Sequence, residues 1–323
     1  MIAIVTNKQD HTADFLIVEL QRRGAAYFRL NTEDFAQHTI CWSVPLSEAN
    51  YIVLRTGRKI PLAEISCVWY RRPYPPRVDC ADGAAVQFST GENQAALDGF
   101  LVSLTDCMWV SEPHMIRRAE LKMLQLRVAE SLGFTLCPSV ITNSPTEAQR
   151  FVMSASDVVI YKPLRSARII SGESVALIYT NIVSEADEAE LVHLAGCPVL
   201  LQYYAQKAVE LRITVIGDKV FAVALHSQES HGAQVDWRRV NASELQHSKH
   251  ILPSEIEALC IRLVSTLGLQ FGAIDMILTP GGEYVFLEIN PNGQWAWLQQ
   301  LLPSLPLRES LADLLQSRSP ART

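Results

Sequence analysis

The chain has 323 residues, of which 48% are hydrophobic and 19% are charged, so it is long enough for two or three domains with a substantial buried core. Its formal net charge of −6 gives no electrostatic support for a nucleic-acid partner. Its apolar runs are too short to span a bilayer, and its start lacks the basic region and long apolar core of a secretion signal, so we expect a cytoplasmic protein with no membrane partner.

Strand and helix patterns alternate over the first 110 residues. We expect strands at 2–6, 26–30 and 67–70, and helices at 13–23 and 92–105. A β-α-β start predicts a parallel sheet with a right-handed crossover. We therefore expect an N-terminal α/β domain over residues 1–110.

The pattern changes near residue 111, where a second domain is expected to begin and to continue to residue 205. Apolar positions and a terminal Gly133 predict one long helix over 111–133, with Lys122 inside it. The expected later elements are an extended segment at 135–138, a helix at 145–153, strands at 158–163, 175–179 and 199–204, a polar loop at 164–174, and a helix that starts in the acidic run 184–190.

A third domain is expected over residues 206–323. It begins with a hairpin of two strands, 209–215 and 219–225, and strict alternation places Glu210 and Arg212 on one face. These two side chains either form a cross-strand ion pair or line a cleft. A long polar excursion with Asp236-Trp237-Arg238 follows the hairpin, and long loops inside compact domains are often functional.

The last polar cluster lies on two strands joined by a turn at 279–282. In the second strand, alternation predicts that Phe286, Glu288 and Asn290 share one face. The hairpin brings Asp275 of the first strand near Glu288 and Asn290. Three oxygen ligands of this kind suit Mg²⁺, and the alternative is a set of ordinary polar residues at a strand end.

Several familiar patterns are missing from the sequence. Neither GxGxxG nor GxxxxGK[ST] occurs, so any nucleotide is not held by a conventional glycine loop. The seven cysteines are scattered and show no zinc or disulfide spacing. Arg55, Arg71 and Arg72 either bind an anion or a carboxylate-rich partner, or have a structural role.

The order of the polar motifs along the chain resembles that of the ATP-grasp superfamily. The motifs are Lys122, Lys162-Pro163, Gln202-Tyr203-Tyr204, Glu210-Leu211-Arg212, Asp275 and Glu288-Ile289-Asn290. The resemblance covers nearly the whole chain. It implies a fold of the α/β and α+β class, with ATP between two α+β subdomains and a pre-grasp α/β domain before them.

The resemblance also implies a role for each of these residues. The implied ATP-binding residues are Lys122, Lys162, Gln202, Tyr203, Tyr204 and Glu210, with the segment 202–204 pairing with adenine through its backbone. The implied Mg²⁺ ligands are Asp275, Glu288 and Asn290, and the implied catalytic residues are Arg212 and Arg238. Such a site suits phosphoryl transfer, which depends on positioning and charge neutralisation.

Three stretches are similar to those of microviridin-type ligases, which build graspetides: Val68–Pro73, His226–Gln228 with Asp236–Arg238, and Glu288–Trp295. Such enzymes phosphorylate an Asp or Glu side chain of a ribosomal precursor peptide, which has a leader and an acidic core. A Ser, Thr or Lys side chain then closes an ω-ester or ω-amide ring. The resemblance implies ATP and Mg²⁺ as cofactors, a homodimer, and an approach of Tyr70, Arg71 and Arg72 to the peptide.

Three other functions remain open at this point. An ATP-grasp ligase that adds a free amino acid to a peptide or protein carboxylate would share the nucleotide residues, although Asp236-Trp237-Arg238 favours peptide maturation. A kinase of small polyols would leave phosphate on its product. A non-catalytic nucleotide-binding module is disfavoured because Arg212 and all of the implied metal ligands are present.

Overall fold

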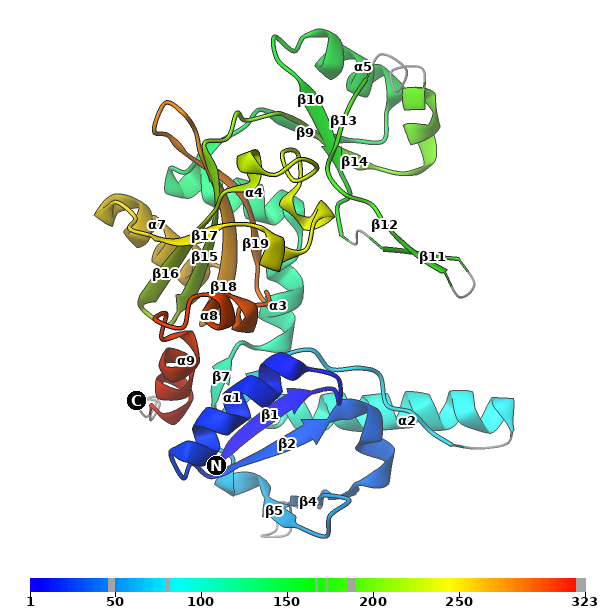
Figure 1. Ribbon diagram of the computed structural model, residues 1–323. Coiled ribbons are helices and arrows are strands. Elements are labelled where there is room, and N and C mark those ends of the chain that lie inside the picture. The colour runs from blue at the N-terminus through cyan, green and yellow to red at the C-terminus, as the bar shows by residue number, and fades with distance from the viewer. Residues whose placement is uncertain (46–49, 80–81, 166–167, 172–173, 185–189, 318–323) are drawn as a thin grey trace. The chain divides into compact units, whose positions relative to one another are not determined.

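The computed structural model describes residues 1–45, 50–79, 82–165, 168–171, 174–184 and 190–317 (Figure 1). The chain divides into two compact units, which are described separately. Unit 1 contains Met1–Pro113, Gln294–Ala296 and Pro306–Thr323, and unit 2 contains His114–Gly293 and Trp297–Leu305. The chain therefore leaves unit 1 twice, after Pro113 and after Ala296, and returns to it each time.

Unit 1 is built on a parallel four-stranded sheet of order β2-β1-β6-β7. Its strands are β1 (Ile2–Thr6), β2 (Tyr27–Asn31), β6 (Cys67–Tyr70) and β7 (Met108–Val110), and its helices are α1 (His11–Arg22), α2 (Gly83–Val102) and α9 (Leu307–Gln316). A small antiparallel sheet is formed by β3 (Thr39–Cys41), β4 (Tyr51–Val53) and β5 (Lys59–Pro61). The predicted β-α-β start and parallel sheet are confirmed.

The core of unit 1 includes a segment from the far end of the sequence. Helix α9 packs against α1, and its Leu311 is fully buried. Arg23, which follows α1, donates to Asp313 at 2.7 Å and to the Glu309 carbonyl at 3.1 Å. A separate difference from the sequence prediction concerns α2, which begins at Gly83 rather than residue 92 because Asp82 caps it by accepting from the Ala84 N–H.

Unit 2 contains two larger sheets and a hairpin (Figure 1). The six-stranded sheet has the order β17-β16-β15-β18-β19-β8, and the four-stranded sheet has the order β13-β10-β14-β9. The six strands are β8 (Thr135–Leu136), β15 (Val209–Ile216), β16 (Lys219–Leu225), β17 (His247–His250), β18 (Phe271–Leu278) and β19 (Tyr284–Asn290). The four strands are β9 (Ser139–Thr142), β10 (Val159–Lys162), β13 (Asn181–Ile182) and β14 (Val199–Tyr203).

The hairpin of unit 2 consists of β11 (Arg168–Ser171) and β12 (Ser174–Leu177). The prediction of a loop throughout 164–174 is therefore wrong for 168–171, where the apolar Ile169-Ile170 pair forms part of a strand. The expected helix start at 184–190 lies mostly outside the described residues. The helices of unit 2 are α3 (Pro113–Ala119), α4 (Lys122–Leu132), α5 (Pro145–Met153), α7 (Ser254–Thr266) and α8 (Ala296–Leu301), the first and last of which begin in unit 1.

The single helix predicted over 111–133 is wrong, because α3 and α4 are separated at Leu121, whose backbone is extended. The break leaves the Ala119 carbonyl without a partner in its own helix, and the buried Gln125 side chain donates to it at 2.6 Å. Gly133, with φ +93, ends α4 as predicted. Lys122 consequently lies at the first position of a helix rather than inside one.

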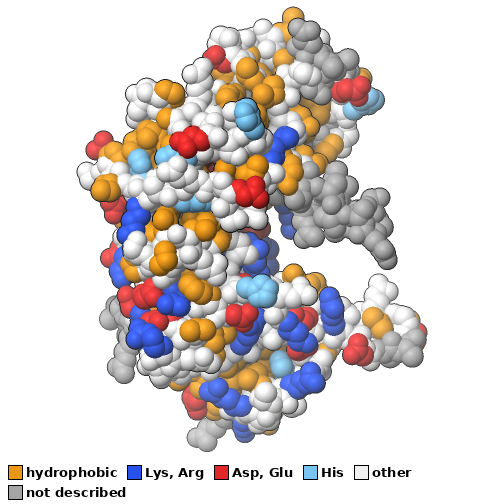
Figure 2. Space-filling model, in the orientation of Figure 1, with side chains coloured by type: hydrophobic (Ala, Val, Ile, Leu, Met, Phe, Trp, Pro, Cys, Tyr) orange, Lys and Arg blue, Asp and Glu red, His pale blue; other side chains and the backbone are white. Residues whose placement is uncertain are grey.

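On the face drawn in Figure 2, most Lys and Arg side chains lie in the lower half of the view, where they are mixed with Asp and Glu side chains. Within the described part of the chain, no helix combines the length and the hydrophobicity needed to cross a membrane. The six cysteines in that part are all free thiols.

Candidate active site

Three adjacent strands of the six-stranded sheet bring three charged side chains into one row. Arg212 of β15 pairs with Asp275 of β18, and Asp275 pairs with Glu288 of β19. The Arg212 Nη1 donates to both Asp275 oxygens, at 2.8 and 2.9 Å. Burial raises the pKa of Asp275, and the Arg212 guanidinium opposes this effect. The arginine therefore stabilises a carboxylate that burial alone would leave protonated more easily.

A bulge in β19 changes which side chains face the row. Asp275 pairs with Glu288, but the next residue, Met276, pairs with Phe286, so Leu287 is an extra residue in β19. Leu287 and Glu288 both line the same cleft, whereas Phe286 is fully buried and packs against Phe134 with tilted rings, 5.2 Å between ring centroids. The prediction that Phe286 and Glu288 share a face is therefore wrong, because it assumed unbroken alternation.

Glu288 is bound by a cation from a different element. The Lys122 ammonium, at the start of α4, forms a hydrogen-bonded ion pair with the Glu288 carboxylate. The positive charge of Lys122 holds the pKa of Glu288 well below its usual range. The break between α3 and α4 makes this contact possible because it places Lys122 at a helix end.

Gln125 connects the broken helix to the strand that carries Glu288. Besides its bond to Ala119, its amide nitrogen donates to the Ile289 carbonyl at 2.8 Å, and its oxygen accepts from the Ile289 N–H at 3.3 Å. Gln125 is only 1% exposed. It therefore fixes α4 and β19 relative to each other, next to the Lys122–Glu288 pair.

These strands form one wall of a cleft that also reaches the four-stranded sheet. The cleft is lined by Cys137, Ile160, Lys162, Thr180, Gln202, Tyr204, Ala205, Lys207, Glu210, Val235, Asp236, Trp237, Arg238, Asp275, Ile277, Leu287 and Glu288. It encloses about 580 Å³, including space open to solvent. This size, and the mixture of apolar walls with converging charges, is typical of small-molecule sites.

Lys162, at the end of β10, points into this cleft. Its ammonium donates to the Gln202 side-chain oxygen at 2.9 Å, and the Gln202 nitrogen donates to the Ser139 hydroxyl at 2.9 Å. Burial lowers the pKa of Lys162 to about 8, although Glu288 acts in the opposite direction. Lys162 therefore loses its charge much closer to neutral pH than an ordinary lysine.

The two tyrosines that follow Gln202 diverge. The Tyr203 ring packs against Phe151 of α5 at 5.0 Å, outside the cleft, whereas Tyr204 lines the cleft. The backbone N–H groups of Tyr203 and Tyr204 donate to the carbonyls of Pro138 and Val158. These two N–H groups are therefore already used. Hydrogen bonds to a purine would come from the carbonyl groups of the segment 202–204 or from the residues after Tyr204.

Glu210 of β15 lies deeper in the cleft and is 7% exposed. One of its oxygens accepts from Lys207 at 3.0 Å and from the Ser227 hydroxyl at 2.9 Å. Burial raises the pKa of Glu210, and Lys207 and Ser227 oppose the rise. Arg212 forms a cross-strand ion pair with Asp275 of β18, whereas Glu210 pairs with Lys207 and lines the cleft.

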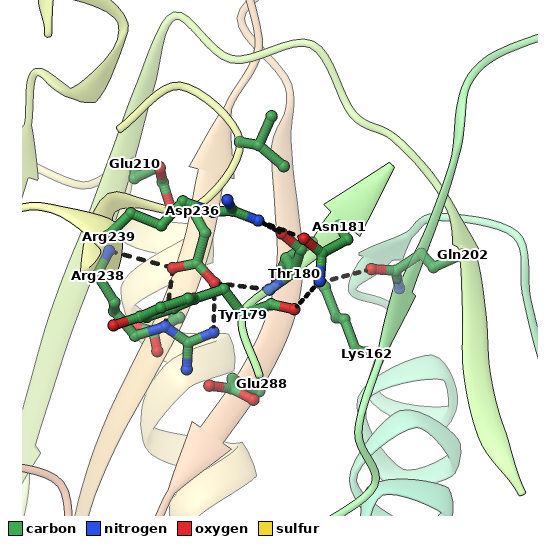
Figure 3. A network of polar contacts seen from close by, with 12 residues as sticks. Lys162, Tyr179, Thr180, Asn181, Gln202, Glu210, Asp236, Arg238, Arg239 and Glu288 are labelled. Carbon is green, nitrogen blue, oxygen red and sulfur yellow. Dashed lines mark hydrogen bonds and ion pairs between the residues drawn. The ribbon is translucent and has the colours of Figure 1, made fainter. Parts of the chain in front are cut away.

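Residues 235–238 line the cleft, and Figure 3 shows Asp236 and Arg238 in a polar network with Thr180. Asp236 accepts from Arg238 through Nε at 2.8 Å and Nη2 at 2.7 Å, and from the Thr180 N–H at 2.9 Å. Burial tends to raise the pKa of Asp236, but these hydrogen bonds outweigh it and hold the pKa at about 2. In Figure 3 the Arg238 guanidinium lies on the same side of this network as Glu288.

Arg239 extends the same network toward the four-stranded sheet. Its guanidinium donates to the Thr180 carbonyl at 2.8 Å and to the Asn181 side-chain oxygen at 2.5 Å, and it lies 5.5 Å from the centre of the Tyr179 ring. Thr180 is thus bound through both its N–H and its carbonyl by residues of one loop. The loop is therefore held against the strand that contains Asn181.

Asn290 lies two residues beyond Glu288 on β19 and is not among the residues that line the cleft. It lies opposite Ala273, at the exposed end of β19, and its side-chain oxygen accepts from the Asn292 N–H at 3.0 Å. Gly293 packs tightly nearby, because a Cβ at this position would lie 2.3 Å from the Ala273 Cβ and 2.7 Å from the Arg212 Nη2. The close approach of the backbone to the Ala273 Cβ thus requires glycine at 293.

Four residues of this site have no role predicted from the sequence: Gln125, Thr180, Lys207 and Arg239. The spacing of Lys207 and Glu210, three residues apart at the start of a strand, was a usable signal for one ion pair. Thr180, Arg239 and Gln125 make contacts with residues 56 to 164 positions away, which local patterns do not encode. Of these three residues, only Arg239 has a local signal, because it follows the Asp236-Trp237-Arg238 motif.

The residues present fit a nucleotide with Mg²⁺. Asp275, Glu288 and Asn290 supply hard oxygen donors, and Lys122 and Lys162 supply positive charge beside them. No cluster of three His, Cys, Asp or Glu residues suited to a metal occurs in the described ranges. Asp275 and Glu288 supply only two carboxylates, so further ligands to Mg²⁺ would have to come from the Asn290 amide oxygen or from oxygens of the nucleotide. Both carboxylates are paired with cations that phosphate groups can compete for.

The chain is similar to known proteins both in sequence and in fold. Residues 1–117 match the family profile described as the MvdD pre-ATP grasp domain. No curated protein sequence matches the chain. A RiPP-associated ATP-grasp ligase of Chryseobacterium gregarium, solved in complex with ADP and a leader and core peptide, is 31% identical, with 99% of this chain and 98% of that chain covered and a TM-score of 0.90.

Two macrocyclases of Microcystis aeruginosa MRC are also similar. MdnC, solved with the precursor peptide MdnA, is 30% identical, with 98% of this chain and 99% of that chain covered and a TM-score of 0.84. MdnB is 32% identical, with 98% of each chain covered and a TM-score of 0.77. The likeness therefore extends over both units.

Proposed function

Because the chain belongs to the family of RiPP-associated ATP-grasp ligases, of the type that forms graspetides, we propose that it activates Asp or Glu side chains of a ribosomal precursor peptide with ATP and closes ω-ester or ω-amide rings. The observation that carries this proposal is the row of Arg212, Asp275 and Glu288 on three adjacent strands, at the wall of a cleft that contains Lys162. Charge neutralisation in such a row is what phosphoryl transfer requires.

Each of the predicted nucleotide-binding residues has a proposed role in this reaction. Lys122 and Lys162 bind the phosphates of ATP, and Gln202 orients the Lys162 ammonium through their 2.9 Å hydrogen bond. Gln202 to Tyr204 and Glu210 bind the adenine and ribose. Because the Tyr203 and Tyr204 N–H groups are already donated, the carbonyls of this segment are the better candidates for the base.

Asp275, Glu288 and Asn290 would hold Mg²⁺, which when bound offsets the negative charge of the phosphates. Arg212 and Arg238 stabilise the transferred phosphoryl group and the activated carboxyl group. Asp236 orients Arg238, since it accepts from both Nε and Nη2 of that guanidinium. Exclusion of water by the segment 234–239 protects the acyl-phosphate from hydrolysis.

The proposed reaction has two chemical steps. A carboxylate oxygen of the peptide attacks the terminal phosphorus of ATP, which gives ADP and an acyl-phosphate. A hydroxyl or amine of the same peptide then attacks the acyl carbon, loses its proton and releases phosphate. Each ring therefore removes the elements of one water from the peptide.

We further propose that the protein acts in the cytoplasm as a homodimer, with a pre-grasp domain at 1–110 and ATP-grasp subdomains at 111–205 and 206–323. Support for self-association comes from α2, whose outer face is uncharged and exposed over five turns. This face, the α2 seam, consists of Ala84, Phe88, Gly91, Ala95, Gly99 and Val102. Phe88 is 70% exposed and Val102 is 79% exposed.

The direct test is the intact mass of a precursor peptide encoded beside this protein, after incubation with ATP, Mg²⁺ and the protein. We expect the loss of one water per ring and equal release of ADP and phosphate. A gain in mass equal to an amino-acid residue would instead identify a ligase of free amino acids, and a gain equal to phosphate would identify a kinase. Either gain, or an unchanged mass with every neighbouring peptide, would overturn the proposed ring closure.

A further inference from the structure

The sheet of unit 1 places two polar residues where open α/β sheets bind ligands, at the carboxyl ends of neighbouring strands. Asp10 follows β1, and Arg71 follows β6, the strand beside β1. Arg71 is only 1% exposed, so its guanidinium does not reach a peptide in solvent, contrary to the prediction that Arg71 approaches the substrate. The side chain must therefore serve another purpose.

The Arg71 guanidinium instead binds a residue from the end of the sequence. Its Nη2 donates to the side-chain oxygen of Gln294 at 2.8 Å, and the Thr12 hydroxyl donates to the same oxygen at 2.5 Å. The chain's own Gln294 thus occupies the position where other α/β sheets place a ligand. One oxygen atom of Gln294 receives hydrogen bonds from the end of β6 and from the first turn of α1.

Asp10 balances the charge of Arg71 in this buried cluster. One of its oxygens lies 3.9 Å from the Arg71 Nε and accepts from the Thr6 hydroxyl at 2.7 Å. The other oxygen caps α1 by accepting from the N–H groups of Thr12 and Ala13. Because Asp10 is fixed by its own bonds, it holds Arg71 in one position.

The residues on each side of Gln294 are also fixed. Trp295 is fully buried and packs on Phe15 of α1, at 5.9 Å between ring centroids. On the other side the chain enters unit 2 at Gly293, whose backbone packs against Ala273 and Arg212. The loop 290–293, which carries Asn290, is thus fixed at Gly293. It leads directly to Gln294, whose side chain is bound by Arg71 and Thr12.

We infer that Arg71 is a positioning residue, which restrains the loop 290–293 through its hydrogen bond to Gln294 and so keeps Asn290 available as a metal ligand. The catalytic part of this inference rests on the proposed function. The structural part does not, because restraint of the loop is measurable without turnover.

Hydrogen exchange of the loop amides tests the restraint. The Asn292 and Gly293 N–H groups donate to the Asn290 side chain and backbone, so their exchange reports opening of the loop. Gln294→Met preserves the length of the side chain but removes the acceptor, and we expect exchange about tenfold faster at both amides, as for loss of a hydrogen bond to a charged donor. Gln294→Glu retains an acceptor for Arg71 and should restore slow exchange.

The matched control is Gln87→Met, the same substitution at an exposed position of α2, which should leave exchange at the loop unchanged. Arg71→Lys keeps the charge but lacks the Nη2 donor, so it should behave like Gln294→Met. Unchanged exchange in both Gln294→Met and Arg71→Lys would overturn the inference, whether or not the protein is a ligase.

Kinetics then separate positioning from contact with the peptide. In Gln294→Met and Arg71→Lys, we expect the Mg²⁺ concentration for half-maximal turnover to rise about tenfold, while the KM for the peptide stays unchanged. A rise in the peptide KM alone would assign Arg71 to substrate contact and overturn the inference. Faster exchange with an unchanged Mg²⁺ requirement would also overturn it, because the loop would then be irrelevant to the metal.

Discussion

The carboxylates of the cleft are each held by a cation from nearby. Glu288 pairs with Lys122, Asp275 with Arg212, Glu210 with Lys207, and Asp236 with Arg238. A buried carboxylate without such a partner would be protonated or would destabilise the fold. The pairs therefore keep these acids ionised and available in the absence of any ligand.

Glu288→Gln tests the assignment of this residue as a metal ligand. The substitution removes the negative charge that faces Lys122, and we expect turnover to fall by about a hundredfold or more, as when a charge-stabilising group is removed. Turnover at saturating ATP and Mg²⁺ is the measurement, with circular dichroism to verify the fold. Glu283→Gln, on the same hairpin but exposed, is the matched control; equal activity of the two variants would remove Glu288 from the site.

The pKa of Lys162 predicts how ATP binding depends on pH. Burial places this pKa near 8, so the ammonium is protonated below that pH and becomes neutral as the pH rises through it. We expect ATP affinity to weaken above about pH 8, because a phosphate-binding charge is lost. Bound phosphate favours the charged form, which shifts the midpoint upward in the complex.

Lys162→Arg provides the test, since arginine stays protonated over the whole range. Titration of ATP binding between pH 7 and 9.5 should show the alkaline weakening in the wild type and not in this variant. Lys219→Arg, at an exposed hairpin position, should retain the wild-type profile. An alkaline limb that persists unchanged in Lys162→Arg would show that another group is responsible.

At the scale of elements, the break between α3 and α4 and the bulge in β19 shape the site together. The break places Lys122 at a helix end, and the bulge turns both Leu287 and Glu288 toward the cleft. Gln125 connects the two irregular elements through bonds to Ala119 and Ile289. Neither irregularity is a local defect, because each is stabilised by contacts with the other element.

Gln125→Leu should therefore destabilise the protein. The change leaves two carbonyls and one N–H without the bonds that Gln125 supplies, and we expect a loss of about 2 to 4 kcal/mol in the free energy of unfolding. Urea denaturation measures it. Arg127→Leu, on the exposed side of the same helix, should change stability by less than about 0.5 kcal/mol. Similar losses of stability in both variants would contradict a stabilising role for the Gln125 hydrogen bonds.

These elements also show what the sequence can predict. The alternation of polar and apolar residues in β15, together with the turn residues Gly217-Asp218, is sufficient to predict the hairpin of β15 and β16. The break at Leu121 has no local signal, since neither Gly nor Pro interrupts residues 114–132 and the stabilising contact comes from a side chain four residues later. The bulge at Leu287 is equally silent, because an alternating sequence does not reveal an inserted residue.

At the scale of the whole molecule, each unit is built from segments that are far apart in the sequence. Helix α9 completes unit 1, although it follows the entire six-stranded sheet of unit 2. The fold class and the set of cleft residues could be predicted because the polar motifs occur in a characteristic order. Which distant segments pack together could not, because the apolar face of an amphipathic helix such as α9 carries no information about its partner.

The α2 seam gives a prediction for the assembly. An uncharged stripe on the exposed side of a helix is expected to pack against another apolar surface, and a second copy of the same helix satisfies this symmetrically. Phe88→Lys should convert the proposed homodimer to a monomer in sedimentation analysis, whereas Gln87→Lys, beside it, should not. A monomeric wild type at micromolar concentration would contradict the proposed homodimer.

The pairing of charges in the cleft has a consequence for the order in which ligands arrive. The site holds five cations against four carboxylates, so as a whole it repels a bare divalent ion. The cations are Lys122, Lys162, Lys207, Arg212 and Arg238, and the carboxylates are Glu210, Asp236, Asp275 and Glu288. A lone Mg²⁺ would have to displace Lys122 and Arg212 from their acids unaided. A nucleotide offers those cations new anionic partners, so its arrival exposes the carboxylates, and the metal enters with it or after it.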